Sequence, residues 1–187
     1  EPDNMMVRTS LVQVLIHVKD FVAAQSEIES TLALAQSIRA PERSELYFDL
    51  ALIAKHQNQL VQALNYLNQA ESFADEINSV LMQAAIADLR GEIHNNNGAY
   101  TQAQTAFEQA LKLNTTIRCP IGISDNHLKL ANLLALQGKR ESALEHYNQA
   151  KSVIETHRLD TMRDSLSAFK NIWYTNKQIS SLMPATR

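Results

Sequence analysis

Apolar residues recur along the chain on stripes with helical spacing, and the stripes repeat about every 40 residues. In the clearest stripe, apolar side chains fall three, four and seven positions apart, as on one face of an α-helix. Its members are Leu60, Ala63, Leu64, Leu67, Ala70 and Ala74. Equivalent stripes follow at Tyr100, Ala103, Phe107 and Ala110, and at Ala143, Leu144, Tyr147, Ala150 and Ile154. The pattern predicts one helical unit that is stacked several times.

Each unit contains a second candidate helix, which precedes the stripe and is separated from it by a short turn. In the three clear copies the turn holds Asn58, Gly98 or Gly138. A residue just past a helix end often takes a left-handed conformation, which glycine and asparagine tolerate. Pro41 and Pro120 fall between units, where a helix has to stop or start. We therefore expect antiparallel helix pairs.

A weaker copy, offset by 39 residues, precedes the clear ones, and one further amphipathic stretch follows them. The weaker copy has its stripe at Phe21, Ala24, Ile28, Thr31 and Ala35, and the last stretch carries Leu159, Met162, Leu166, Phe169, Trp173 and Asn176. We expect repeats over 5–39, 44–78, 84–118 and 124–158, with a closing helix over about 160–180. The predicted fold class is all-α, with four helix pairs and a terminal helix in one solenoid over residues 1–187.

Composition supports a helical chain and argues against several classes of protein. The 187 residues include only four Gly and four Pro, which leaves long segments uninterrupted. The net charge of −3 argues against a dedicated nucleic-acid binder, which normally carries a basic stripe. No run of about 18 apolar residues occurs, so we expect no membrane insertion.

Cysteine usage and the first residues bear on the compartment. Cys119 is the only cysteine, so the chain can form neither an internal disulfide nor a thiolate metal cluster. We expect a reducing, cytoplasmic setting, although a periplasmic domain without disulfides would look the same. The chain starts with Glu-Pro-Asp and lacks the features of a signal peptide, so we expect a fragment of a longer protein rather than a processed chain.

The order of small and large residues within a unit resembles the tetratricopeptide repeat. The best-matching unit contributes Gly91, Gly98, Tyr100, Ala103, Phe107 and Ala110. The consensus Trp of the first helix is replaced by Tyr47, Ala87 and His127. A period of 40 instead of about 34 resembles repeats of bacterial regulators, such as the maltose-regulon activator, Rap-type regulators and sensor segments of diguanylate cyclases. The resemblance covers residues 5 to 177 and implies a right-handed superhelix.

Signals for catalysis are weak. Six histidines are scattered without a His-Glu-x-x-His motif, and no phosphate-binding loop or nucleophile motif occurs. Asp88 and Glu92 are four apart on one predicted helix face, where like charges can raise one pKa. We expect no enzyme activity, no bound metal and no cofactor. An atypical enzyme would have to use these two carboxylates.

The resemblance implies that the first helices of the pairs line a concave groove. Its groove-facing positions that could contact a ligand are Phe48, Leu52, His56, Asp88, Glu92, Asn95, Leu128 and Asn132. Asparagine amides can pair with a peptide backbone, and apolar side chains can anchor it. These positions predict a groove for a segment with apolar anchors and a basic residue. Equally, Phe48 and Leu128 could belong to the core.

We therefore predict a non-catalytic module that binds a protein or peptide, as the sensing or regulatory part of a bacterial signalling protein or transcriptional regulator. Such a module would bind no nucleic acid itself. The alternative is a scaffold that bridges subunits through its convex face and terminal helix. In that helix Phe169, Trp173 and Tyr174 could cap the stack, or dock an attached output domain or a second copy of the chain.

Overall fold

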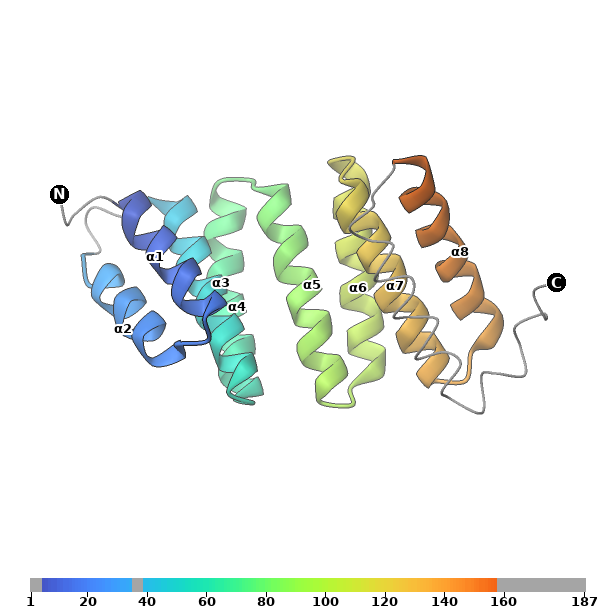
Figure 1. Ribbon diagram of the computed structural model, residues 1–187, viewed down its shortest axis with the longest axis horizontal. Coiled ribbons are helices and arrows are strands. Elements are labelled where there is room, and N and C mark those ends of the chain that lie inside the picture. Colours follow the sequence, from blue (N-terminus) through green and yellow to red (C-terminus); the bar gives the residue numbers. More distant parts are fainter. Residues whose placement is uncertain (1–4, 35–38, 158–187) are drawn as a thin grey trace.

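The computed structural model describes residues 5–34 and 39–157, and over these residues all regular structure is α-helical. The helices are α1 (Met5–His17), α2 (Phe21–Leu32), α3 (Ala40–His56), α4 (Leu60–Glu76), α5 (Val80–Asn96), α6 (Tyr100–Thr116), α7 (Pro120–Leu136) and α8 (Arg140–Thr156). They form successive antiparallel pairs along the long axis of the molecule (Figure 1). The predicted all-α stack of helix pairs is confirmed.

The period of 40 residues comes from helix length. Each helix from α3 to α8 has 17 residues, and turns of three residues join them. The first helices begin at residues 40, 80 and 120, four residues before the unit starts expected at 44, 84 and 124. Proline in the first turn of α3 and α7, and a Ser79 cap that accepts from the Met82 amide, favour these earlier starts. The expected closing helix lies outside the described residues.

The turns inside the pairs have the predicted left-handed residue. Asn58, Gly98 and Gly138 have φ of 60°, 71° and 74°, and Lys19 takes the same place in the first pair with φ of 63°. After α3, for example, the Asn58 amide donates to the Lys55 carbonyl at 3.0 Å, and the next amide donates to the Ala54 carbonyl at 2.8 Å. These two hydrogen bonds satisfy backbone carbonyls that would otherwise be unpaired at the end of the helix.

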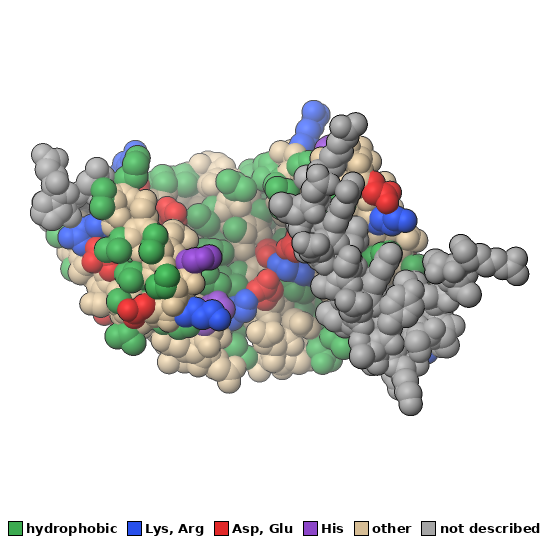
Figure 2. Space-filling view, viewed as in Figure 1, with side chains coloured by type: hydrophobic (Ala, Val, Ile, Leu, Met, Phe, Trp, Pro, Cys, Tyr) green, Lys and Arg blue, Asp and Glu red, His purple; other side chains and the backbone are tan. Residues whose placement is uncertain are grey.

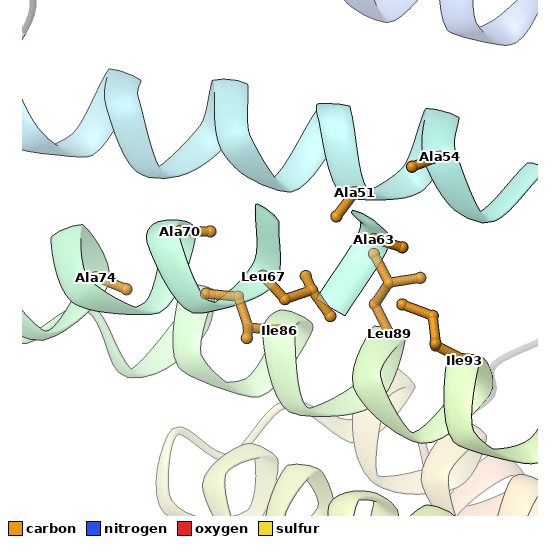
Figure 3. Packing of buried hydrophobic residues seen from close by; sticks show 9 residues of the cluster. All are labelled: Ala51, Ala54, Ala63, Leu67, Ala70, Ala74, Ile86, Leu89 and Ile93. Carbon is orange, nitrogen blue, oxygen red and sulfur yellow. The ribbon is translucent and has the colours of Figure 1, made fainter. Parts of the chain in front are cut away.

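A second helix lies between its own partner and the first helix of the next unit, as α4 does between α3 and α5. Alanine stripes on the second helices determine how closely these helices pack. Figure 3 shows Leu67 between Ala63 and Ala70 on α4, with Ile86 and Ile93 of α5 directed towards them. All five side chains are fully buried. Alanine lets the helices approach closely, and the larger residue fills the space between the alanines. The second helices α2, α4 and α6 thus each touch their own partner and the first helix of the next unit.

The same packing sets the first helices beside one another, which positions the groove.

No helix within 5–34 and 39–157 is long and apolar enough to cross a membrane.

Candidate partner-binding groove

Side chains from neighbouring first helices bond to one another across one face of the molecule. Figure 2 shows that this face is hollowed near its middle and that basic and acidic side chains gather in the hollow. The bonds join Gln13 to Asp49, Lys55 to Glu92, and Lys129 to Asp88. They link α1 to α3, α3 to α5, and α5 to α7. This face is therefore the concave groove expected from the repeat.

Lys129, on α7, is the centre of the charged network. Its Nζ lies 2.8 Å from Glu92 Oε1 and 2.9 Å from Asp125 Oδ2, and it also bonds Asp88. Burial by itself lowers the pKa of this ammonium, but the three carboxylates outweigh burial and hold the pKa above its ordinary value. The ammonium therefore stays charged and keeps α5 and α7 tied together at the floor of the groove.

The two carboxylates of α5 are four residues apart but have pKa values shifted in opposite directions. Burial raises the pKa of Asp88, and Lys129 offsets that effect only in part. Burial acts on Glu92 in the same sense, but Lys129 and Lys55 together outweigh it and lower the pKa of Glu92. Repulsion between the two carboxylates adds to the rise at Asp88 but is a smaller cause than burial.

A pocket of about 230 Å³ opens beside this network. Its lining comes from all three of the last units: Lys55, Glu92, Asn95, Asn96, Phe107, Lys129 and Asn132. Within the described chain, Asn95 Oδ1 is buried and accepts no hydrogen bond. A buried acceptor without a donor is costly.

The structure brings four of the expected groove residues together. Asp88 and Glu92 belong to the charged network, and Asn95 and Asn132 line the pocket next to it. Glu92 belongs to both the charged network and the lining of the pocket.

The other four candidates are not among the residues that line this pocket. Phe48 and Leu52 are half-buried and pack against the core between α3 and α5. The exposed His56 stacks on the Phe21 ring of α2 with centroids 5.1 Å apart. Leu128 is only 5% exposed because α8 packs over it, so it belongs to the core of the fourth unit rather than to the groove. The expected capping or docking residues Phe169, Trp173 and Tyr174 lie outside the described residues.

Sequence reasoning did not select Lys129, although a signal was present. The repeat places Asp49, Leu89 and Lys129 at equivalent positions, so the charge at this position changes from copy to copy. It also did not select Asn126, which donates to Asp88 Oδ1 at 2.7 Å and accepts from Asn114 at 2.8 Å. Asn126 replaces the aliphatic residues of the earlier units, and only the fold shows that it reaches Asp88.

A second titratable pair lies in the fourth unit, outside the groove. His127 Nδ1 and His146 Nδ1 are 2.9 Å apart, at the repeat positions where the second unit has Tyr47 and Tyr66. Burial and the neighbouring ring lower the pKa of His127 to about 4. In the described part of the chain, no group of three or more His, Cys, Asp or Glu side chains could hold a metal ion.

Comparison with protein families supports the repeat identified from the sequence. Residues 84–116, which span most of α5 and all of α6, match the family model described as tetratricopeptide repeat. The predicted resemblance is confirmed there. No curated protein matches the chain.

Solved structures of several other proteins have a similar fold. The apo form of RapI has 14% identity and a TM-score of 0.75, over 92% of this chain and 65% of that one. A signal transduction ATPase with a tetratricopeptide repeat sensor, from Pyrococcus horikoshii, has 14% identity and a TM-score of 0.81, over 96% of this chain and 28% of that one. MamA has 16% identity and a TM-score of 0.65, over 84% and 82%.

These likenesses show the fold alone, because the identities are low. The chain spans less than two thirds of RapI and under a third of the ATPase.

Proposed function

We propose that this chain, a tetratricopeptide-repeat protein, is a non-catalytic module that binds a peptide or protein segment in the groove of its first helices. The observation that carries the proposal is the pocket beside the charged network, which Asn95, Asn96 and Asn132 help to line. The side-chain amides of these asparagines offer donors and acceptors to the backbone of a bound segment. Recognition of backbone groups suits an extended segment better than a compact small molecule.

The charges of the network favour a basic residue in that segment. Three carboxylates, from Asp88, Glu92 and Asp125, face the two ammonium groups of Lys55 and Lys129. The network therefore keeps a surplus of negative charge. A Lys or Arg side chain of the partner would complement that surplus, and salt would weaken its binding.

We further propose that the module is the sensing or regulatory part of a bacterial signalling protein or transcriptional regulator in the cytoplasm. The fold is similar to part of a signal transduction ATPase that has a tetratricopeptide repeat sensor, which supports this role. A segment that bridges α3, α5 and α7 binds across unit boundaries, so it would favour one tilt of the units over another. An attached output domain would respond to that change.

Selection from a displayed library of random peptides tests the groove. The selected peptides should bind the 187-residue chain, and Asn95→Ala or Asn132→Ala should weaken binding by about tenfold or more. The matched control is Asn65→Ala, at an exposed position on α4. Affinity of peptides that contain a basic residue should also fall as salt rises.

If the peptides bind all three variants as tightly as the original chain, the groove is not the binding site. The alternative function, a scaffold that bridges subunits through its convex face and terminal helix, would then be favoured.

A further inference from the structure

A second pocket, of about 270 Å³, lies in the third unit between α5 and α6. Its lining is mostly polar and includes Arg90 and His94 from α5, and Gln102, Thr105 and Ala106 from α6. Arg90 and His94 each follow a carboxylate of the charged network by two positions, which places them about 200° further round the helix. The pocket is therefore outside the groove.

The second unit has a tyrosine ring at the equivalent place. Tyr66, which is 40 positions before Ala106, is half-buried, and its hydroxyl accepts a hydrogen bond from Gln62 Nε2 at 2.9 Å. The ring of Tyr66 therefore extends along α4 towards Gln62. In the third unit the counterparts of these two residues, Ala106 and Gln102, both line the pocket.

The wall contributed by the first helix has the same correspondence. Tyr66 packs against the core cluster that includes Leu50, and Leu50 corresponds to Arg90. The fourth unit also has a ring at the position of Tyr66, because His146 stands there. The pocket of the third unit is thus the place that a tyrosine ring fills in the second unit.

Arg90 is held in a position that suits contact with a ring. Its guanidinium donates to the two carboxylate oxygens of Glu71 at 3.1 and 2.8 Å, and to Asn68 Oδ1 at 3.2 Å. A guanidinium fixed in this way can stack on an aromatic face at little further cost in entropy. Gln102 has the same amide donor that Gln62 offers to the Tyr66 hydroxyl.

We propose that this pocket binds a tyrosine side chain of a partner protein, seated as Tyr66 is in the second unit. The ring would contact Arg90 and Ala106, and its hydroxyl would accept a hydrogen bond from Gln102. The pocket is smaller than sites that enclose a drug-sized ligand, so the ring is the anchor of a larger partner.

Titration of the 187-residue chain with p-cresol, the side chain of tyrosine without its backbone, tests the site by heteronuclear NMR spectroscopy. The amide signals around the pocket should shift, with a dissociation constant on the order of millimolar for a ligand of this size. Ala106→Tyr should abolish these shifts, because its own ring would fill the pocket. The matched control, Thr115→Tyr, adds a ring at an exposed position further along α6 and should leave them unchanged.

A second pair of measurements does not depend on whether Ala106→Tyr folds. N-acetyl-tyrosinamide, which carries peptide groups on both sides of the residue, should bind at least as tightly as p-cresol. Gln102→Leu should weaken that binding by about fivefold, because the hydroxyl loses its donor. The same variant should leave the binding of N-acetyl-phenylalaninamide unchanged.

The proposal is overturned if p-cresol shifts no signals around the pocket, if the shifts persist in a folded Ala106→Tyr variant, or if Gln102→Leu affects both amides equally. Binding of p-cresol without binding of N-acetyl-tyrosinamide would also overturn it, since the pocket would then take a free phenol only. The groove is tested by Asn95→Ala and Asn132→Ala, so failure at either site leaves the other proposal standing.

Discussion

Gly91 shows how one missing side chain lets two helices meet. A Cβ atom built at this position would lie 2.5 Å from the Phe107 ring, well inside contact distance. Glycine in a helix interior costs about 1 kcal/mol relative to alanine. That cost is offset because the Phe107 ring packs directly on the backbone of α5 and is 2% exposed.

Gly91→Ala should therefore lower the free energy of unfolding by about 1–3 kcal/mol, although alanine is the better helix former. The Cβ would push the Phe107 ring out of its site. Urea denaturation measures the change, and Phe107→Leu in the same chain should recover part of it, because leucine is smaller and more flexible. A stabilised Gly91→Ala variant would mean that the ring is not in contact with this backbone.

Asp49 is a buried carboxyl with a strongly raised pKa. It is 1% exposed, and Gln13 Nε2 lies 2.9 and 2.8 Å from its two oxygens. Burial raises the pKa to about 7, and the bonds from Gln13 offset burial only in part. The folded chain thus holds a proton that the unfolded chain loses near pH 4.

This proton makes the free energy of unfolding fall as the pH rises from about 4 through 7. Asp49→Asn has no such titration. The variant should be more stable than the original chain at pH 8, by on the order of 3 kcal/mol, and the advantage should vanish near pH 4. Urea denaturation at both pH values tests this, and a difference that does not change with pH would contradict it.

At the scale of the elements, the left-handed turn residues give a matched pair of tests. Arg118, after α6, has φ of 53°, whereas Gly98, after α5, has φ of 71° and no atom within 4 Å of an added Cβ. Only backbone strain distinguishes glycine from other residues at such places.

Arg118→Gly should raise the free energy of unfolding by up to about 1 kcal/mol, because glycine relieves the strain. Gly98→Ala should lower it by about the same amount for the opposite reason. Thermal or urea denaturation of the two variants, compared with the original chain, measures both changes. Shifts of the same sign would rule out strain as the cause.

Across the whole molecule, the buried Asp49 and a half-buried histidine pair make the free energy of unfolding change with pH in opposite directions. Asp49 lies where α1 meets α3, and the His127–His146 pair lies between α7 and α8. Burial lowers the pKa of both histidines. The folded chain therefore binds fewer protons there than the unfolded chain, and the pair loses stability as the pH falls from about 6.5 towards 4.

Global denaturation would record the sum of these opposite effects, so a local measurement is needed. Hydrogen exchange, corrected for intrinsic rates, should show that α7 and α8 lose protection between pH 7 and pH 4.5. The double variant His127→Ala, His146→Ala should remove this loss, because the third unit has Ala87 and Ala106 at the same positions. Loss of protection in the double variant equal to that in the original chain would exclude the histidines as the cause.

The repeat and its turns could be predicted from the sequence because they depend on neighbours in the chain. Helical spacing, alanine stripes and a residue that tolerates positive φ are all local properties. They were sufficient for the number of described helix pairs and for the left-handed residues at Asn58, Gly98 and Gly138. The starts of α3, α5 and α7 were missed by four residues, because helix ends depend weakly on pattern.

The tertiary structure decided which of the irregular positions work together. Asp88 and Glu92 were visible as a pair, but the directions of their pKa shifts depend on burial at Asp88 and on Lys129 and Lys55 at Glu92. Lys129 lies 41 and 37 positions away from the two carboxylates along the chain. Leu128, the neighbour of Lys129 in the sequence, belongs to the core because α8 packs over it. Burial and long-range pairing depend on how units pack, which the local pattern of a single helix does not contain.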